Sequence, residues 1–483
     1  MATLFTHATI VTLDPARRVL EDCALRVQGD RITAIDPGLR PEPGEKVIDC
    51  RGKLLIPGLI DAHGHAGHCL IRGIGADTSP LWMKIVTPTY WHQTTREFWA
   101  AEGLVSGLER LRAGVTTGAS IISSMPRSDD PEFAAAHASA YKTLGLRNIL
   151  CTGPAGLPWP RDATRWETGR PVRRSISFAE MMEGAEATIQ TLDGTAEGRI
   201  KVYLTPFTIV PSIETSNIST PDQAVRLTQD DRDHARAVRE LARKYGIRLH
   251  SDAFAGHVRL AAQDKENALL GPDIHIQHCW GISPAEIDIL AETGTPVTHA
   301  PPGRNTPVVE MMARGIPLAV TTDGTAPNRH FDLLQTARLF QSVQHVLRGH
   351  DRYFFPPGKV LEMITIDAAR VLGLDHEIGS LEVGKKADLV VLDMRSPHWT
   401  PDWQPVHRLI AQAVGSDVQT VMVDGRIVMD DRRITSVDEA AALAEGNRIA
   451  RELVTRAGLK DHLRDPGWGQ LYRTFDAPVA VPG

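Results

Sequence analysis

The sequence is poor in cysteine and lacks long apolar runs. Its 483 residues include five cysteines and no CxxC pair, which argues against a disulfide framework and a thiolate zinc site. No stretch of about 18 apolar residues occurs, so we expect no membrane span. The first residues also lack the basic region, apolar core and cleavage site of a secretory signal. We therefore expect a cytoplasmic protein.

A strong net charge is also absent. Lys and Arg number 53 against 59 Asp and Glu, a formal charge of −6, and no basic run marks a surface for nucleic acid or an anionic membrane. We expect a small-molecule substrate, and neither a nucleic acid nor a membrane as partner. Histidine, in contrast, is abundant: 19 histidines outnumber 11 Phe and 6 Tyr. Histidine ligates metals and transfers protons near neutral pH, so the search for a site begins there.

Short strand-like runs occupy both ends of the chain, and the middle has a different pattern. Residues 56–374 alternate about eight apolar, strand-like runs with helical patterns, which is the order of a (β/α)8 barrel. We predict an α/β fold: a TIM-type barrel, with a small composite β-sandwich domain formed by residues 1–55 and 375–435. Residues 436–483 are expected to form a helical, then irregular, extension. An open doubly wound sheet is the alternative, but it leaves the polar residues at so many strand ends unexplained.

Polar residues follow several predicted barrel strands. His63 and His65 come after the run LLIPGLIDA, and residues two apart on a strand point to the same side, so both can bind one metal ion. Later strand-like runs end at His250, His278 and Asp323. The C-terminal ends of barrel strands face the active site. We therefore expect these five side chains to surround a divalent cation of the Zn, Fe, Co or Mn type.

These motifs resemble the metal-dependent amidohydrolase superfamily over nearly the whole chain. PGLIDAHGH, the isolated His250 and His278, and TTDG carry the resemblance, and GKKADLVVLD is similar to the triazine hydrolase and heterocyclic deaminase branch. The resemblance implies one divalent metal per chain, with zinc as the first choice, and a homo-oligomer. It implies His63, His65, His250 and Asp323 as ligands, Asp323 also as general base, and His278 as a catalytic residue that orients water or substrate.

One departure from that branch bears on the substrate. Branch deaminases have His-x-x-Glu at strand five, whereas residues 250–253 read His-Ser-Asp-Ala, so Ala253 replaces the proton-carrying glutamate. Asp252 is one residue earlier and is expected to point elsewhere unless the strand bulges. Hydrolysis at an amide, urea or carbamate carbon needs no ring protonation. We therefore predict a hydrolase of a non-peptide C–N bond in a small, fairly apolar molecule, with phenylurea and thiocarbamate hydrolases as analogues.

Three alternatives to this function remain open. The first is a deaminase or dechlorinase of an N-heterocycle, in which another residue replaces the glutamate. The second is a binuclear, dipeptidase-like hydrolase, in which Lys201 of the strand RIKVYLTP is carboxylated and bridges two metals. The third is an inactive binding protein, against which the intact set of ligands argues.

Four further residues are predicted to bind the substrate, because they follow barrel strands one and seven. His68 and Trp82 lie in the segment after the first strand, which is expected to overhang the site. His299 and Asn305 follow the seventh strand in the run THAPPGRN, where relatives of the superfamily often bind substrate.

Overall fold

A computed structural model describes six stretches of the chain. Two of the predicted substrate-binding residues, Trp82 and Asn305, lie outside the described residues. No helix among the described residues combines the length and the apolarity that crossing a membrane requires. The described stretches are residues 2–74, 86–167, 169–213, 226–303, 306–349 and 354–463.

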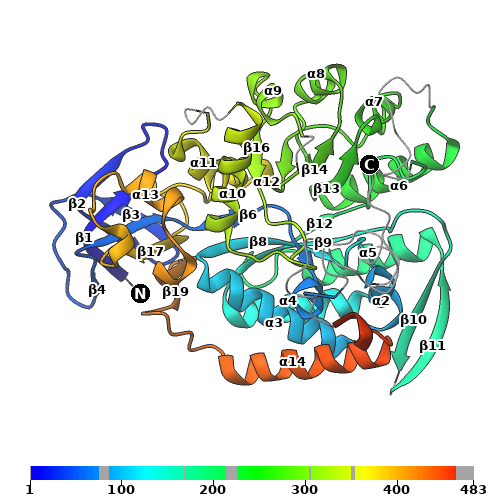
Figure 1. The fold of residues 1–483 in the computed structure, drawn as a ribbon, viewed down its shortest axis with the longest axis horizontal. Helices are drawn as coiled ribbons and strands as arrows, with labels where there is room; N and C mark the ends of the chain where they lie inside the picture. Colours follow the sequence, from blue (N-terminus) through cyan, green and yellow to red (C-terminus); the bar gives the residue numbers. More distant parts are fainter. Residues whose placement is uncertain are drawn as a thin grey trace, which may run out of the picture.

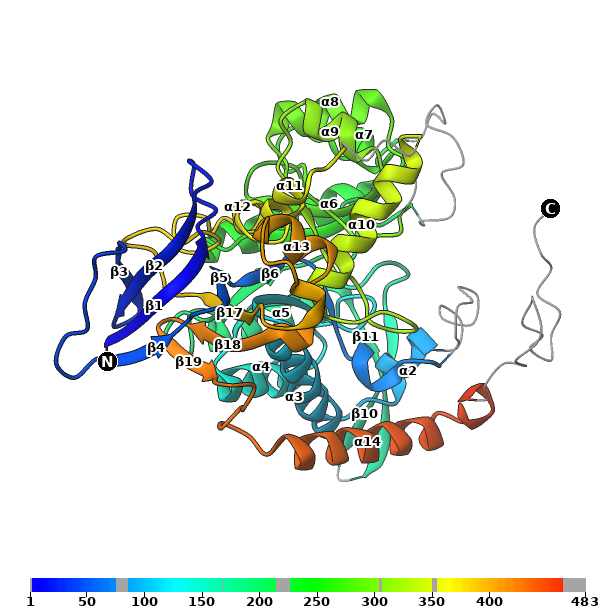
Figure 2. The same ribbon diagram turned by 60° about the vertical axis from the view of Figure 1, so that its left-hand side comes forward.

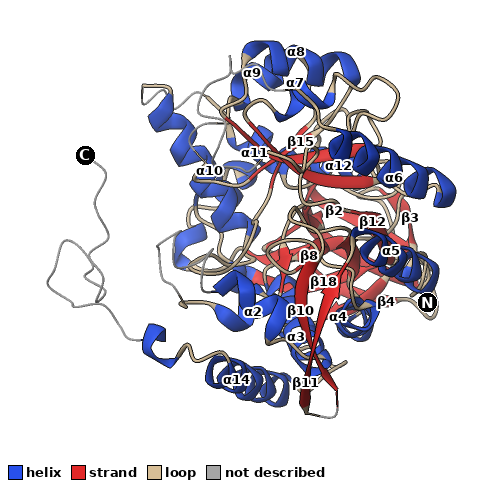
Figure 3. Cartoon of the chain, turned by 90° about the vertical axis from the view of Figure 1, so that its right-hand side faces the viewer, coloured by secondary structure: helices blue, strands red, loops and turns tan. Residues whose placement is uncertain are grey.

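Eight parallel strands form the centre of the molecule, with helices around them (Figures 1 and 3). Their hydrogen-bonded order is β16-β15-β14-β13-β12-β9-β8-β6, which is also their order along the chain, and this confirms the predicted (β/α)8 barrel. A two-residue strand, β7 (His65–Ala66), pairs with β8 beyond the end of β6. The barrel strands are β6 (Leu59–Asp61), β8 (Val115–Ile122), β9 (Arg147–Thr152), β12 (Ile200–Leu204), β13 (Leu249–Phe254), β14 (Ile274–Trp280), β15 (Val297–His299) and β16 (Leu318–Val320).

Helices cover the outside of the barrel, so its strands are buried on both faces. Every residue of β8 and β9 is buried, as expected for parallel strands between helices. Three of the helices begin with capping boxes, at Ser177, Thr228 and Ser283, where the side chain of the third helical residue bonds back to the cap. The helices are α3 (Arg96–Arg112), α4 (Pro131–Leu144), α5 (Phe178–Leu192), α6 (Gln229–Tyr245), α8 (Pro284–Thr293), α9 (Val308–Ala313), α10 (Leu333–Leu347), α11 (Pro357–Met363) and α12 (Ile366–Leu372).

Shorter elements follow the C-terminal ends of the barrel strands. A two-stranded hairpin extends from the barrel between β9 and α5 (Figure 1). These connecting elements are η1 (His68–Ile71), α2 (Thr87–His92), the hairpin strands β10 (Arg161–Glu167) and β11 (Arg170–Ile176), and α7 (His257–Ala261).

Strands from the two ends of the chain share one sheet beside the barrel (Figures 1 and 2). The order is β19-β18-β17-β5-β1-β2-β3, and β4 also pairs with β1, so a β-rich body accompanies the barrel as predicted. Strand β5 continues past residue 55, the boundary that the sequence predicts, and the exact boundaries stay a prediction. The elements are β1 (Ala2–Val11), β2 (Val19–Gln28), β3 (Arg31–Ile35), β4 (Lys46–Asp49), β5 (Lys53–Pro57), β17 (Leu389–Asp393), η3 (Pro397–Trp399), α13 (Pro405–Ala411), η4 (Gly415–Asp417), β18 (Val418–Val423) and β19 (Arg426–Met429).

The last described helix, α14 (Glu439–Arg456), lies along α3 of the barrel, and η5 (Lys460–Leu463) follows it (Figure 1). Arg112 at the end of α3 donates from Nε to Oε1 of Glu439 over 2.7 Å, which joins the start of α14 to the barrel. Ile449 and Leu453 of α14 are buried in the main hydrophobic core. The helical part of the extension therefore packs on its own barrel.

Candidate metal centre

The barrel brings the predicted histidines and aspartate together at the C-terminal ends of its strands. The ring of His63 lies 5.1 Å from that of His65, 4.9 Å from that of His250 and 5.8 Å from that of His278, between centroids. Asp323 Oδ1 is 3.4 Å from His63 Nε2 and 3.3 Å from His65 Nε2. Residues up to 260 positions apart in the chain thus form one cluster.

Two overlapping groups within this cluster have the geometry of a metal site. In each group three ligand atoms lie within 4.8 Å of one another, among the residues that the structure describes. Nitrogen and carboxylate oxygen donors of this kind suit zinc and its first-row neighbours. The first group is His63, His250 and Asp252, and the second is His63, His278 and Asp323.

Hydrogen bonds to backbone carbonyls orient two of the histidines. His65 Nδ1 donates to Ser123 O over 2.7 Å, and His250 Nδ1 donates to His275 O over 3.1 Å, because a carbonyl oxygen only accepts. The neutral ring of His250 is then left with the lone pair of its Nε2 toward the cluster. Burial alone would lower the pKa of His65, but Asp323, whose Oδ1 lies 3.3 Å from His65 Nε2, raises it, so positive charge is favoured between these two atoms. A cation at this position would contact both atoms, and the donor set therefore fits a metal ion.

Burial sets the protonation of the cluster. It lowers the pKa of His250 to about 3, that of His278 to about 4, and that of His63 well below its ordinary value. Burial alone would raise the pKa of Asp323, but Arg329 and hydrogen bonds from neighbouring histidines hold it well below its usual range. These three imidazoles are therefore neutral and the carboxylate is ionised at pH 7, which are the states in which such groups bind metals.

A bulge in β14 directs His278 toward the cluster. The pairing of β13 with β14 passes from Ala253 opposite His278 to Phe254 opposite Trp280, so Cys279 is an extra residue. His278 and Cys279 both adopt left-handed backbone conformations, with φ of 74° and 51°. Bulges at barrel rims redirect side chains in this way, and the alternation of the sequence does not show them.

Asp252 also belongs to the cluster, and the expectation that it points elsewhere is wrong. It lies two residues after His250 on β13, so the two side chains share a face of the strand. Its Oδ2 is 3.8 Å from His278 Nε2. Burial raises the pKa of Asp252 to about 8. Alternation counted from His250, rather than comparison with position 253, was the signal in the sequence that would have found this carboxylate.

The described substrate-binding candidates lie beside the cluster. His299, the last residue of β15, is fully buried, and neither of its ring nitrogens has a hydrogen-bond partner among the described residues. Unsatisfied buried nitrogens at a strand end are consistent with a bound ligand or water. The ring of His68 stacks on that of His65 with centroids 4.7 Å apart, so His68 packs against a candidate metal ligand.

Two aromatic residues that sequence reasoning did not single out flank His278. The ring of Trp280 lies 4.3 Å from that of His278, and the ring of Phe254 lies 5.5 Å from it, between centroids. Trp280 is 39% exposed, which is unusual for an indole at a barrel strand end. In the sequence, Trp280 could have been found as the aromatic residue two positions after the candidate catalytic His278. The pair offers an apolar wall for a planar substrate.

Lys201 is not brought to the cluster. It is the second residue of β12, and the register of β12 with β13 places Leu204 opposite Leu249. Lys201 thus lies three residues, or about 10 Å of strand, before the level of Leu249. It lines a cavity of about 170 Å³ together with Arg248, which precedes β13 at the opposite end of the barrel. A lysine in this position cannot bridge metals at the cluster.

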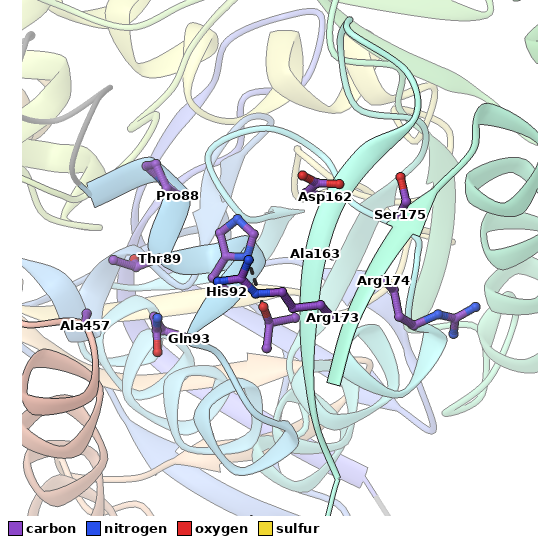
Figure 4. A pocket seen from close by; sticks show the side chains of 11 residues that line it. Pro88, Thr89, His92, Gln93, Asp162, Ala163, Arg173, Arg174, Ser175 and Ala457 are labelled. Atoms are coloured by element: carbon purple, nitrogen blue, oxygen red, sulfur yellow. Dashed lines mark hydrogen bonds between the residues drawn. The ribbon is translucent and has the colours of Figure 1, made fainter. Parts of the chain in front are cut away.

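A larger cavity, of about 650 Å³, lies between α2 and the hairpin β10–β11 (Figure 4). His92 lies in it, with Nδ1 3.1 Å from Thr164 Oγ1. A neighbouring cavity of about 490 Å³ shares His92 and reaches Met125, two residues past the carbonyl of Ser123 that orients His65. Neither cavity is lined by a candidate metal ligand, so both lie outside the metal centre.

Comparisons with known sequences agree with this geometry. The profile described as "Amidohydrolase family" matches residues 54–428. A 5'-deoxyadenosine deaminase from Methanosarcina mazei is 29% identical over 472 residues, which cover 94% of this chain and 98% of that protein. A 5-methylthioadenosine/S-adenosylhomocysteine deaminase from Desulforudis audaxviator is 32% identical over 425 residues, which cover 85% of this chain and 89% of that protein.

Solved structures share the fold. A crystal structure of an atrazine chlorohydrolase from Arthrobacter aurescens complexed with zinc has a TM-score of 0.77 at 20% identity, covering 93% of this chain and 100% of that one. A crystal structure of an adenosine deaminase from Xanthomonas campestris with bound zinc has a TM-score of 0.76 at 24% identity, covering 94% and 98%.

Proposed function

The chain belongs to the amidohydrolase family, and from that premise we propose that it hydrolyses an amide, urea or carbamate C–N bond in a small, fairly apolar molecule. It is a hydrolase of C–N bonds other than peptide bonds; the class of bond and the roles of the residues are the proposal. One divalent transition metal ion is the cofactor, with zinc as the first choice, since two structural neighbours contain zinc. A homo-oligomeric and cytoplasmic enzyme completes the proposal, and sedimentation of the purified chain tests the oligomer.

The cluster supplies each role that this hydrolysis needs. His63, His65, His250 and Asp323 would hold the cation, which supplies Lewis acidity and makes water nucleophilic near neutral pH. Asp323 accepts the proton of the attacking water, and Arg329 holds its second carboxylate oxygen by an ion pair. The leaving amine then receives that proton.

A second set of groups orients the reacting carbonyl. Two features of the described site support His278 as a donor to the developing oxyanion. Its Nδ1 has no hydrogen-bond partner, and its ring is neutral because burial lowers its pKa to about 4. Trp280 and Phe254 stand beside it and favour a substrate with an apolar or planar part.

The proposed class of bond rests on Ala253, whose methyl group stands in place of a carboxyl group. Ala253 is fully buried and pairs with His278, at the position where heterocyclic deaminases of the branch have a glutamate. An alanine cannot carry a proton to a ring nitrogen. The carbonyl carbon of an amide, urea or carbamate is attacked without that step, so the reaction tolerates alanine there.

Deamination of an N-heterocycle is the second candidate, and two observations favour it. The relatives that match along most of the chain are named deaminases. Asp252 also places a carboxyl group 3.8 Å from His278 Nε2, so an acid is present one residue away from the missing glutamate. In this reaction Asp252, rather than residue 253, would protonate the ring nitrogen. The position of Lys201 gives a binuclear, dipeptidase-like enzyme no such support.

A substrate panel combined with the variant Asp252→Asn separates the two candidates. The panel contains anilides, ureas, carbamates and aminoheterocycles, assayed with the zinc-loaded enzyme. We expect turnover of the first three classes, and a loss of kcat in Asp252→Asn of less than about tenfold, because no proton passes through Asp252. Asp162→Asn is the control. It changes an exposed carboxyl group that lines the cavity of about 650 Å³ between α2 and the hairpin, and its kcat should match that of the wild type.

The opposite pattern would overturn the first candidate. If only aminoheterocycles are turned over, and Asp252→Asn lowers kcat by about 10²-fold or more, the enzyme is a deaminase with Asp252 as its acid. Zinc content measured on both variants shows whether Asp252 acts on the ion or on the substrate.

A further inference from the structure

The seam between the first and last barrel strands passes through the metal centre. β16 and β6 are the two ends of the sheet, and no ladder joins these two described strands. The amide of Ile60 in β6 donates instead to Ile364 O, in the connection between α11 and α12, over 2.9 Å. Backbone contact across the seam resumes at the ligands themselves, where Asp323 N donates to His63 O over 3.1 Å. The backbone contact that closes the barrel between β6 and β16 therefore lies at the candidate metal ligands.

The side chain of Asp61 takes the place of the missing ladder. Its Oδ1 accepts a hydrogen bond from the backbone amide of Thr322 at 3.0 Å, and its Oδ2 accepts one from the hydroxyl of Thr322 at 2.7 Å. Asp61 is the last residue of β6, two residues before His63, and Thr322 directly precedes Asp323. One carboxylate thus ties the two chain segments that carry ligands on either side of the seam.

Arg110 of α3 holds that carboxylate in place. Its Nη2 donates to Asp61 Oδ2 at 3.1 Å and to Ala119 O at 2.7 Å, and its Nη1 donates to Tyr141 Oη at 2.6 Å. Both partners of the ion pair are buried, with side chains 1% and 0% exposed. A buried carboxylate without a partner would be strongly unfavourable, so the arginine both neutralises and orients Asp61.

Two glycines make room for this arginine. A Cβ at Gly64, between His63 and His65, would lie 2.5 Å from Arg110 Nη2. A Cβ at Gly118 in β8 would lie 2.7 Å from Arg110 Cζ. The guanidinium group therefore fills the space directly behind the His-Gly-His turn, and its position is coupled sterically to both histidines.

We propose that Asp61, held by Arg110, is a positioning residue that fixes Asp323 relative to His63 and His65 through Thr322. Closing the barrel seam and binding the metal are then coupled, because an ion held by His63, His65 and Asp323 would join the same two segments that the Asp61 carboxylate connects. The inference rests on the proposed metal centre and adds residues that contact neither the ion nor the substrate. Loss of the tie leaves the ligands in place but no longer preorganised, which weakens metal binding.

The matched pair Thr322→Val and Thr322→Ser tests this coupling. Valine has the shape of threonine but removes the hydrogen bond to Asp61 Oδ2, whereas serine keeps it. Zinc affinity is measured by competition with a chromophoric chelator, starting from the holoenzyme. We expect about tenfold weaker binding for Thr322→Val, and binding within about twofold of the wild type for Thr322→Ser. Thr188→Val, which removes a buried hydroxyl bonded to Gly184 O within α5, is the control and should bind zinc as the wild type does.

Hydrogen exchange supplies a readout independent of activity. In Thr322→Val we expect faster amide exchange in residues 58–66 and 318–324 than in the wild type, and zinc should slow it. Thr322→Ala removes the same hydroxyl and replaces the valine variant if that chain does not fold. If the variant without the hydroxyl has the zinc affinity and the amide exchange of the wild type, the inference is wrong, while the proposed function is unaffected. A wild-type chain that binds no zinc would overturn both the inference and the proposed function.

Discussion

Asp323 combines an uncommon backbone conformation with a fixed charge. Its φ of 61° lies in the left-handed region, which aspartate tolerates better than most residues. The amide of Gly324 donates to its Oδ1 at 2.6 Å, and Arg329 pairs with Oδ2. The carboxylate is therefore oriented from both sides before any ligand arrives. It is the one residue that joins the proposed binding of the cation to the proposed acceptance of the water's proton.

Replacing Asp323 by asparagine should separate charge from shape. Asp323→Asn keeps the side-chain volume but loses the negative charge, so we expect a lower zinc content and a fall in kcat of about 10²–10⁴-fold. The measurements are metal analysis of the purified chain and steady-state kinetics on the best substrate of the panel. Asp288→Asn, on the surface in an ion pair with Arg314, should behave as the wild type. Full activity in Asp323→Asn would exclude it as the base.

At the scale of single elements, helix α6 carries a titratable group into the core. His234 is 2% exposed and packs against Trp159 and Phe178, with ring centroids 5.8 and 5.7 Å away. Burial lowers its pKa from 6.5 to about 4, against a smaller opposing effect of Asp231. The neutral ring is an apolar packing surface in the folded state, while the unfolded chain binds a proton at its ordinary pKa.

This burial makes part of the stability dependent on pH. The contribution of His234 is fully present above pH 6.5 and is lost as the pH falls toward 4, because the unfolded chain takes up the proton first. His234→Phe keeps a ring and removes the titration. We expect its free energy of unfolding to fall by about 2 kcal/mol less than that of the wild type between pH 8 and pH 5. Urea unfolding at both pH values measures this difference.

A histidine on the surface provides the control for this experiment. His376→Gln removes a side chain that is 71% exposed and should leave the pH dependence unchanged. An equal loss of stability in His234→Phe and the wild type would mean that His234 takes up its proton as readily in the folded protein as in the unfolded chain.

At the scale of the whole molecule, a buried cluster of charges joins the barrel to the β domain. Arg147 of β9 donates from Nη2 to Asp424 Oδ1 at 2.8 Å and to Asp388 Oδ1 at 3.3 Å. Asp388 precedes β17 and Asp424 lies between β18 and β19, while all three side chains are 5% exposed or less. Arg147 thus pairs with two carboxylates of the neighbouring sheet, and Arg199 and Lys386 add longer pairs with Asp424 at 3.5 and 3.6 Å.

Removing Arg147 should destabilise the contact between the barrel and the β domain. Arg147→Met keeps the length of the apolar stem but leaves two buried carboxylates without their main partner, at a cost of about 3–5 kcal/mol. Chemical denaturation measures the loss, and an earlier unfolding step of the β domain would locate it. Arg395→Met, which removes a half-exposed pair with Asp393, should cost less than about 1 kcal/mol. Equal effects of the two variants would contradict a buried cluster.

The sequence alone determined the barrel and most of its candidate ligands, because both depend on local patterns. Apolar runs followed by polar residues mark strand ends, and the C-terminal ends of barrel strands share one face. These patterns predict that His63, His65, His250, His278 and Asp323 lie together, as the structure shows. The same local alternation also contained the position of Asp252, which comparison with the glutamate of the branch obscured.

Only the tertiary structure decided how neighbouring strands are aligned and how the barrel closes. Lys201 is a plausible bridging residue by sequence, but the register of β12 against β13 places it at the opposite end of the barrel. The bulge at Cys279 and the tie between Asp61 and Thr322, 261 residues apart, likewise depend on contacts between distant segments. Such contacts depend on how strands pair and pack, and periodicity within one segment carries no information about them.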